Sequence, residues 1–412
     1  MKFEQYNLDE KVLRGLNTLG FKRPTDIQYK SIPSILNGED LLAIAQTGTG
    51  KTLAFVLPIV EILFNKKRKE RRKGGIKCII LAPTHELALQ INEVFQKIAK
   101  HTSLKSYVII GGVDQDPQIE ALNKGIDVAI ATPGRMFDLI SQGHLRTNDV
   151  ETLVLDEADH MLNLGFIDDI RDLIRVLPKR KQTLFFSATI NKKIKKIAYS
   201  IVKQNAIRIQ ISPKNPVSKN VKHYVVRIDM DDKRFFLERL VFENPESKII
   251  CFVRTKVRAE RVHQAMLRVN IESATIHSDK DQDEREDSLS SFRAGKTNLL
   301  VATDITARGI DIPDVQIVVN YDLPDEPENY VHRIGRTGRG NNKGMAYSFC
   351  APKEQELLQE IEKFIDNKIE VIKVDRKTYS DTLNIKVEKD NDVQALMQEF
   401  EESKKLKRKK RK

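Results

Sequence analysis

The feature that most constrains this chain is a short apolar run that recurs along it and always ends in polar or glycine-rich residues. It appears as LLAIA before QTGTGKT, CIILA before PTHELA, VAIA before TPGR, LVL before DEAD and TLFF before SAT. After a break it resumes as IICFV before RTK, LLVA before TDITARGID and QIVVN before YDLP. Such runs are typical of strands, and the helical patterns between them predict α/β domains whose parallel strands are buried on both faces. Ligands bind at the carboxyl ends of such strands, which is where the polar motifs fall.

The break in this pattern divides the chain. The stretch SPKNPVSKN, residues 212–220, has two prolines and no apolar periodicity, which is typical of a linker. We therefore expect a first domain at 1–211, a second at 221–375 and a tail at 376–412. Within the tail, residues 393–400 have the spacing of a short amphipathic helix, and the Lys/Arg-rich end is expected to be disordered.

The net charge of +12 is concentrated in two segments. The last ten residues carry eight positive charges and no negative ones, and KKRKERRK, residues 66–73, carries seven positive and one negative, so the rest of the chain sums to −2. This distribution favours a polyanionic partner held by local sites and helped by basic appendages. Charge alone gives equal weight to the alternative that both segments are solvated and bind nothing.

Other features bear on the compartment. No stretch approaches the ~18 apolar residues needed to cross a bilayer, and the N-terminus lacks the apolar block of a secretory signal. Cys78, Cys251 and Cys350 form no CxxC pair, which favours buried small side chains over a metal site or a disulfide. We expect a cytoplasmic protein without a membrane partner.

The segment AQTGTGKT, residues 45–52, has the strand–loop–helix context of a phosphate-binding loop. Its glycines let backbone N–H groups close around phosphate oxygens, its lysine reaches the β- and γ-phosphates, and its last hydroxyl coordinates Mg²⁺. The predicted nucleotide-binding residues of this loop are Thr47, Gly48, Thr49, Gly50, Lys51 and Thr52. Lys51 is also predicted to be catalytic and Thr52 to be a metal ligand.

The tetrapeptide DEAD, residues 156–159, follows another apolar run. A carboxylate at a strand end can hold Mg²⁺, so Asp156 is the predicted metal ligand, and the adjacent Glu157 can polarise the attacking water as a general base. Taken alone, the four residues are better read as an acid-rich helix N-terminus, which the helix dipole favours. The phosphate loop upstream reverses that preference.

Together these motifs resemble those of the DEAD-box RNA helicases, from Phe3 to about Val374. The resemblance implies two tandem RecA-like domains and an enzyme that hydrolyses ATP as they close around RNA, unwinding duplexes or remodelling RNA–protein complexes. It also implies that Gln28, in FKRPTDIQ, binds the adenine edge with its amide, and that Phe3 and Phe21 lie near the base.

The resemblance assigns RNA contacts to both domains. They are Pro83, Thr84, Gly112, Thr132, Gly134 and Arg135 in the first, and Gln282, Arg285 and Thr303 in the second. Glycine allows close approach of a phosphate, and the arginine stays charged at any relevant pH. His85 stands where the family usually has arginine, and a neutral imidazole is a weaker phosphate partner. Contacts of this kind suit the RNA backbone, so we expect structured or duplex RNA bound with weak sequence preference.

The remaining assigned residues connect the two activities. By resemblance, Ser187, Thr189 and His332 couple hydrolysis to strand separation, Asp311 meets the ATP ribose, and Arg336 and Arg339 of HRIGRTGR are arginine fingers. The phosphate loop and the fingers belong to different domains, so hydrolysis should need domain closure. ATP and RNA should then tighten each other's binding by the same factor.

Within the family the chain resembles bacterial RhlE-type helicases, although Ser278 replaces a usual glycine. Two other classes compete with a helicase: an RNA-binding clamp that binds ATP with little turnover, and a DNA-directed translocase on the same core. Single-turnover hydrolysis with and without RNA separates the first, and ATPase stimulation by RNA or DNA separates the second. We expect a monomer, and both ribosomal and RNA-decay complexes are compatible partners.

Overall fold

The computed structural model describes residues 2–45, 48–69, 75–179, 181–189, 192–211, 217–304, 312, 315–338 and 342–383. The chain divides into two compact units, and the main boundary falls between residues 216 and 217. This boundary lies inside the expected linker, of which residues 212–216 are outside the described part.

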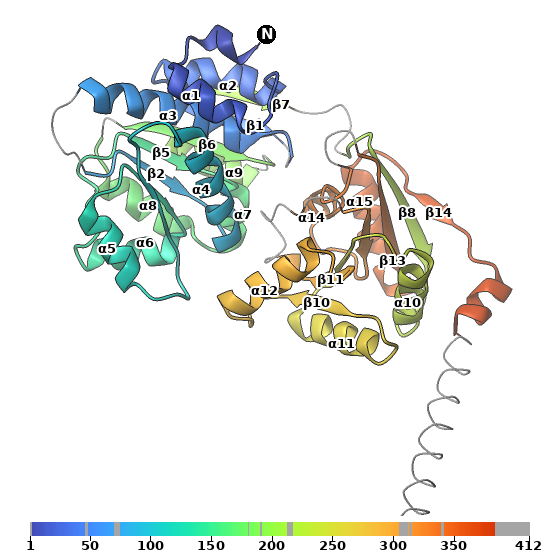
Figure 1. Cartoon of the computed structure of the whole chain (residues 1–412). Coiled ribbons are helices and arrows are strands. Elements are labelled where there is room, and N and C mark those ends of the chain that lie inside the picture. The colour runs from blue at the N-terminus through green and yellow to red at the C-terminus, as the bar shows by residue number, and fades with distance from the viewer. Residues whose placement is uncertain are drawn as a thin grey trace, which may run out of the picture. The chain divides into compact units, whose positions relative to one another are not determined.

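The first unit is built on a seven-stranded sheet with the order β3-β4-β2-β5-β6-β1-β7 (Figure 1). Its strands are β1 (Leu41–Ala45), β2 (Cys78–Leu81), β3 (Ser106–Ile109), β4 (Val128–Ala131), β5 (Thr152–Leu155), β6 (Gln182–Ser187) and β7 (Ile207–Ile211). Its helices are η1 (Phe3–Tyr6), α1 (Glu10–Asn17), α2 (Asp26–Leu36), α3 (Lys51–Lys69), α4 (His85–Ala99), α5 (Asp116–Lys124), α6 (Pro133–Ser141), α7 (Ala158–Asn163), α8 (Ile167–Val176) and α9 (Lys192–Ile201).

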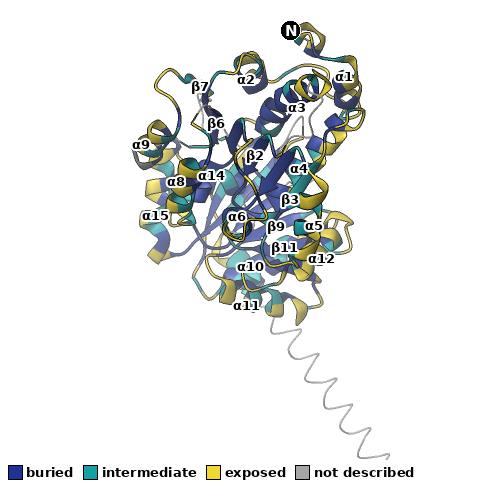
Figure 2. Cartoon of the chain, turned by 90° about the vertical axis from the view of Figure 1, so that its left-hand side faces the viewer, coloured by how far each residue is buried: buried dark blue, intermediate teal, exposed yellow. Residues whose placement is uncertain are grey.

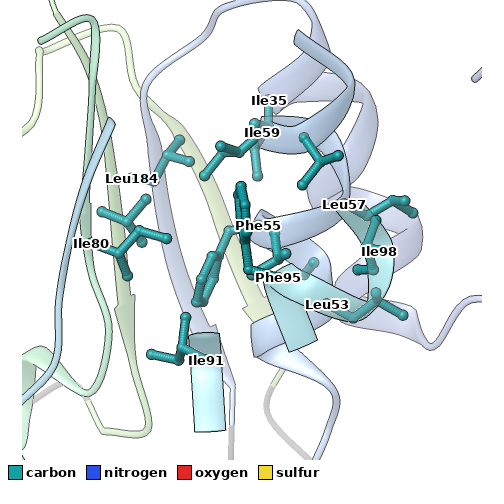
Figure 3. Packing of buried hydrophobic residues seen from close by; sticks show 14 of the residues in the cluster. Ile35, Leu53, Phe55, Leu57, Ile59, Ile80, Ile91, Phe95, Ile98 and Leu184 are labelled. Atoms are coloured by element: carbon teal, nitrogen blue, oxygen red, sulfur yellow. The ribbon is translucent and has the colours of Figure 1, made fainter. Parts of the chain in front are cut away.

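Both faces of this sheet are covered, which is why its central strands are apolar along their whole length. On one face α3 and α4 place Phe55 and Phe95 against Ile80 and Leu184 of the sheet (Figure 3). The rings of Phe55 and Phe186 are 5.2 Å apart, in a tilted pair. Burying each such side chain contributes about 1.5–3 kcal/mol. Figure 2 shows the contrast between buried strands and the exposed outer surfaces of the helices.

The second unit repeats this design with the order β10-β11-β9-β12-β13-β8-β14. Its strands are β8 (Val221–Arg227), β9 (Ile249–Phe252), β10 (Ser273–Ile276), β11 (Leu299–Ala302), β12 (Ile317–Asn320), β13 (Gly344–Cys350) and β14 (Glu370–Ile372). Its helices are α10 (Lys233–Glu243), α11 (Lys256–Leu267), α12 (Gln282–Arg293), α14 (Pro327–Ile334), η2 (Pro352–Glu354) and α15 (Gln355–Phe364). Every recorded strand pair of both sheets is parallel, which confirms the predicted fold class of two tandem parallel-sheet domains.

All eight apolar runs of the sequence form strands. The strands that the pattern missed are less apolar. β3, β7, β10 and β14 lie at the edges of their sheets, and β8 and β13 alternate polar with apolar residues. β3, β7 and β14 are partly exposed, so their sequences carry a weaker apolar signal, whereas β10 is buried but contains a serine and a threonine.

The second unit extends past the expected boundary at residue 375. Residues 376–383 are helical, and Tyr379 Oη donates to Asp232 at 2.7 Å. The ring of Tyr379 also lies 5.1 Å from that of Phe236 on α10. The first residues of the expected tail are therefore part of the folded unit, and residues 384–412 lie outside the described residues.

The basic segment at 66–73 is not wholly an appendage. Lys66, Lys67 and Arg68 belong to α3 and pair with Glu151, Asp127 and Asp9 of the same unit. Exposed pairs of this kind contribute about 0–1 kcal/mol each, but they occupy charges that were expected to be available to a polyanion. Residues 70–73 lie outside the described part of the chain.

The three cysteines are buried, as predicted. Within the described ranges, no helix combines the length and apolar character needed to span a membrane.

Candidate functional site

Three motifs meet at one edge of the first sheet. β5, β6 and β1 are consecutive in the strand order, so the residues that follow them lie side by side. These residues are the DEAD tetrapeptide after β5, the SAT tripeptide at the end of β6 and the phosphate loop after β1. The parallel topology therefore assembles the site that the sequence placed at separate strand ends.

The phosphate loop joins β1 to the start of α3. Gly48 and Gly50 have φ values of 79° and 90°, which glycine adopts without strain. Lys51 is the first residue of α3 and is buried, and its Nζ donates to the Ala45 carbonyl at 2.7 Å. The loop thus presents a lysine and a helix N-terminus to the same place, an arrangement that binds phosphate. Thr47 lies outside the described residues.

Gln28 links α2 to this loop. Its Oε1 accepts from the Thr25 N–H at 3.0 Å, and its Nε2 donates to the Gly50 carbonyl at 3.0 Å. Thr25 Oγ1 donates to the Thr49 carbonyl at 2.8 Å. A Cβ on Gly50 would lie 2.4 Å from Gln28 Nε2, so only glycine permits this approach. An amide oxygen and an NH₂ group each keep capacity for one further bond, which is what an adenine edge requires.

The two aromatic residues expected near the base differ in exposure. Phe3 is 3% exposed and packs in the core with Tyr6, whereas Phe21 is 46% exposed. Phe21 therefore has a ring face available to a ligand. Phe3 anchors the N-terminal segment on the first unit, where the Asp9 N–H also donates to buried Glu61 of α3 at 2.9 Å, and its place near the base stays a prediction.

Asp156 and Glu157 form the acidic part of the site. Asp156 is 2% exposed, and its Oδ1 accepts from the Glu157 N–H at 3.0 Å. Burial raises the pKa of Asp156 to about 7, while nearby Lys51 opposes this shift. Glu157 has φ 48° and ψ 48°, a left-handed conformation that is strained for a residue with a side chain. Strain and a buried carboxyl with a raised pKa are together typical of functional sites.

Asp159, the last residue of DEAD, joins this tetrapeptide to SAT. Its Oδ2 accepts from the Thr189 N–H at 3.0 Å and from Thr189 Oγ1 at 2.9 Å. Ser187 Oγ donates in turn to the Thr189 carbonyl at 2.7 Å. One carboxylate thus links the two motifs directly.

The expected RNA contacts of the first unit also gather at helix N-termini. Thr84 caps α4 by accepting from the Leu87 N–H, and Thr132 occupies the N-cap position of α6. A Cβ on Gly112, where φ is 72°, would lie 3.6 Å from the His85 ring. Arg135 donates to the Val113 carbonyl at 3.0 Å and so holds the glycine loop. Pro83 is buried, and no atom lies within 4 Å of the position of a Cβ on Gly134, so this face is open to a backbone.

The expected RNA contacts of the second unit lie at strand ends and at a helix start. Gln282 is the first residue of α12, which Asp281 caps by accepting from the Glu284 N–H at 2.8 Å. Arg285 is one turn further along the same helix. Thr303 directly follows β11, the neighbour of β9 and β10 in the sheet.

Arg333 organises the end of the second sheet. It is 1% exposed, and its Nε and Nη2 donate to both carboxylate oxygens of Asp304 at 2.6 and 2.7 Å. Its Nη1 donates to the Asp322 carbonyl at 2.6 Å. Arg336 is buried just beyond α14, and its Nε donates to the His332 carbonyl at 3.3 Å. Arg339 and Asp311 lie outside the described residues.

Known proteins resemble the chain along most of its length. The DEAD/DEAH box helicase profile matches residues 25–197, and the helicase conserved C-terminal domain profile matches residues 232–341. The ATP-dependent RNA helicase CshA of Listeria monocytogenes is 40% identical over 361 residues, which are 88% of this chain and 68% of that protein. The chain belongs to the DEAD-box ATP-dependent RNA helicases.

Other DEAD-box helicases agree. RhpA of Helicobacter pylori is 39% identical over 372 residues, which are 90% of this chain and 74% of that protein. The structure of S. cerevisiae Dbp5 bound to RNA and ADP BeF3 matches with a TM-score of 0.81 and 31% identity, over 93% of this chain and 99% of that one. The present chain is therefore an RNA-dependent ATPase and an RNA helicase with tandem RecA-like domains. Its resemblance to the RhlE-type subgroup stays a prediction.

In this DEAD-box helicase, sequence reasoning missed two residues of the site. Asp159 was passed over because its two acidic neighbours Asp156 and Glu157 already had roles, although a buried third acid needs a partner. Arg333 was passed over because Arg336 and Arg339 match the pattern of arginine fingers.

Proposed function

We propose that this helicase hydrolyses ATP at the carboxyl edge of its first sheet and that Arg336 and Arg339 complete the site when RNA draws the two domains together. The observation that carries the proposal is the group formed by Lys51, Asp156 and Glu157. All three are buried, and they follow β1 and β5, the two strands on either side of β6 in the sheet. A lysine beside two carboxylates at a phosphate loop is suited to phosphoryl transfer to water.

Mg²⁺ is the metal that this site fits. Hydroxyl and carboxylate oxygens are its preferred ligands, and Thr52 and Asp156 supply one of each. The buried Asp156 carboxyl has a raised pKa without a ligand, so a bound cation would favour its ionised form. When bound, the metal neutralises charge on the phosphate oxygens.

Glu157 is the proposed general base. Its backbone is left-handed at the turn between β5 and α7, and its negative charge acts on Asp156, whose pKa it helps to raise. The carboxylate accepts a proton from the attacking water while Lys51 holds the phosphates. Arg336 and Arg339 stabilise the charge that develops on the transferred phosphoryl group, which explains why one domain is insufficient.

The adenine is bound by the Gln28 amide and the exposed face of Phe21. This predicts ATP over GTP, because guanine presents the acceptor O6 where adenine presents its N6 amino donor, while N7 is an acceptor in both bases. Thr49, Gly48 and Gly50 supply backbone contacts to the phosphates, and Thr47 and Asp311 are the remaining proposed contacts.

RNA is held mainly by its backbone. Thr84, Thr132 and Gln282 each lie at the start of a helix, where free N–H groups and the helix dipole favour phosphate. Gly112, Gly134, Arg135, Arg285 and Thr303 complete the proposed contacts, and His85 adds one whose charge depends on pH. Such contacts predict structured or duplex RNA as substrate with weak sequence preference.

Hydrolysis is coupled to unwinding through Asp159. Because its carboxylate holds Thr189, release of phosphate next to Glu157 alters the SAT segment directly. His332 is the corresponding coupling residue of the second domain. We propose that the protein works as a cytoplasmic monomer, with ribosomal or RNA-decay complexes as its assemblies.

The experiment that tests this function measures steady-state hydrolysis by the full chain with ATP or GTP, and with RNA, DNA of equal length or no nucleic acid. The proposal expects ATP hydrolysis that RNA stimulates and DNA does not. Equal stimulation by DNA would favour a DNA translocase. Binding of RNA and ATP with no stimulated turnover would favour an RNA clamp.

A further inference from the structure

A basic groove lies on the second domain, and none of its lining residues is assigned to ATP. It has a volume of about 790 Å³ and runs along α10 and α11. Arg261 and Arg268 are exposed on α11 and line it, and Arg234 lines it from the first turn of α10. The first two guanidinium groups make no hydrogen bond or ion pair with any described residue, and that of Arg234 stacks on Phe235 at 4.4 Å.

Most acidic residues of this groove already have a partner in the same domain. Glu260 is hydrogen-bonded to His277 at 2.7 Å, and Asp279 pairs with Lys256 at 2.7 Å. Asp231 is the remaining acid among the lining residues, which also include Arg234, Arg261 and Arg268. The groove therefore has a positive surplus that the domain's own described side chains do not neutralise.

The groove also has an apolar part. Val257 is 55% exposed, and Ala265 lies two turns further along the same face of α11. Positions 257, 261, 265 and 268 share this face, so apolar and basic side chains alternate along it. A ligand that fits must be acidic and apolar at once.

The end of the described chain packs on α10, the helix whose first turn contributes Arg234 to the groove. Arg239 of α10 donates to Thr382 Oγ1 at 2.7 Å, and Tyr379 is held by Asp232, the residue before α10. Figure 1 shows the final helix, drawn in orange-red, beside α10. The chain after Leu383 therefore starts from the same helix that carries Arg234.

The sequence after this point has the required chemistry. Residues 388–402 contain six acidic residues and one lysine. Val393, Leu396, Met397 and Phe400 have the i, i+3, i+4, i+7 spacing that forms one apolar face of a helix. This stretch is an acidic amphipathic segment, and no role assigned above accounts for it.

We propose that the acidic amphipathic segment, residues 388–402, docks in the groove of the same chain, with its apolar face on Val257 and its carboxylates toward Arg261 and Arg268. Fewer than six residues separate it from Leu383, and an extended connection of this length reaches about 15 Å. α11 is about 18 Å long, so the segment can lie along it. A tether this short gives a millimolar effective concentration, so weak contacts suffice.

The competing occupant is an RNA backbone. It shares the negative charge but has no apolar face for Val257, and it has no tether. Docking of the segment would also fix the position from which the basic end, residues 404–412, leaves the second domain.

Disulfide trapping in the full chain tests the proposal. The three native cysteines are buried, so introduced cysteines report alone. One variant carries Gln264→Cys in the groove and Gln398→Cys in the segment. The matched variant adds Arg261→Glu and Arg268→Glu, which keeps every distance of the tether but reverses the groove charge. We expect trapping to slow by about tenfold or more on reversal, the effect of losing about 1.4 kcal/mol of docking.

A second change restores the attraction. Adding Glu401→Arg and Glu402→Arg to the reversed groove should recover most of the trapping rate. Both reversed arginines are exposed, so thermal unfolding of all variants should coincide. Equal trapping rates with native and reversed grooves would overturn the proposal. It would equally be overturned if reversal left trapping unchanged and weakened RNA binding, because the groove would then be an RNA site.

Discussion

The two domains share one architecture but use buried charge differently. In the first, Asp156 is buried with a raised pKa, and Glu157 is strained, so the charges at the sheet edge lack full compensation. In the second, Glu354 accepts from Lys233 Nζ at 2.5 Å and from the Leu323 and Ala351 N–H groups. Holding these reactive groups lowers the stability of the first domain. In the second domain the buried charges are paired, and the pairs hold its elements rigidly together.

This difference fits the different roles that we propose for the two domains. Arg333, with two bonds to Asp304, fixes α14 and the end of β11 as one body. Arg336 therefore projects from a rigid frame, and Thr303 lies on the same frame. Under our proposal, a rigid second domain presents an RNA contact and an arginine finger together, so RNA binding also completes the ATP site.

The largest expected effect comes from removing the second domain's contribution to chemistry. Arg336→Ala should lower RNA-stimulated turnover by about 10³-fold or more, the usual worth of an arginine finger. Equilibrium binding of ATP should change little, because the nucleotide contacts are in the first domain. Stopped-flow hydrolysis at saturating ATP and RNA measures this. Arg293→Ala, on α12 and outside the assigned site, is the matched control. A loss under tenfold would show that the finger is elsewhere.

The next effect removes the base of the first domain. Glu157→Gln should reduce turnover by about 10²–10⁴-fold while ATP still binds, because only proton acceptance is lost. RNA should dissociate more slowly from this variant, since the closed state persists. Turnover at the wild-type rate would contradict the assignment of the base.

The free energy of unfolding should change in opposite directions in the two domains when one buried acid is neutralised in each. Glu354→Ala should destabilise the second domain by about 3–5 kcal/mol, because it leaves Lys233 buried and unpaired. Asp156→Asn should instead stabilise the first domain, by about 0.5–2 kcal/mol, while abolishing activity. Denaturant unfolding of the ligand-free chain, followed by hydrogen exchange in each domain, measures both. Changes of the same sign would remove the contrast between the domains.

The smallest effect concerns acid sensitivity. Burial lowers the pKa of His223 in β8 below its ordinary value of 6.5, and its Nδ1 is 2.9 Å from Tyr330 Oη. Because the pKa of His223 is lower in the folded state than in the unfolded state, the neutral ring contributes to the stability of the fold above pH 6.5. This contribution is lost as the pH falls through the pKa of the folded state. Because the ring is half-buried, the loss should be about 1 kcal/mol or less.

Hydrogen exchange of the second domain between pH 7 and pH 5 measures this loss. His223→Gln retains a hydrogen-bonding group that does not titrate, so it should flatten the dependence. An unchanged pH profile in the variant would assign the effect to other groups.

Much of the fold could be predicted because apolar strands and polar strand ends alternate so regularly. The central strands and the position of the phosphate loop followed from that alternation. The edge strand β14 and the helix at 376–383 could not be predicted, because Tyr379 and Thr382 acquire partners only when α10 folds against them. Pairing across long separations, as between Asp159 and Thr189, is likewise a property of strand order, which periodicity does not contain.

The ion pairs of Lys66, Lys67 and Arg68 show the same limit. Seven positive charges in eight residues indicate a polyanion partner only if the domain's own acids lie elsewhere. Their partners come from the N-terminus and from loops of the sheet, so the charge run could not be interpreted without the fold.

The most direct test of the account compares the full chain with residues 1–211 alone in RNA-stimulated ATP hydrolysis. These residues form a compact unit with the phosphate loop, Asp156 and Glu157 in place. We predict that the isolated domain binds ATP but hydrolyses it at least about 10³-fold more slowly than the full chain, with no stimulation by RNA. Full RNA-stimulated turnover by residues 1–211 would contradict the claim that the second domain completes the site.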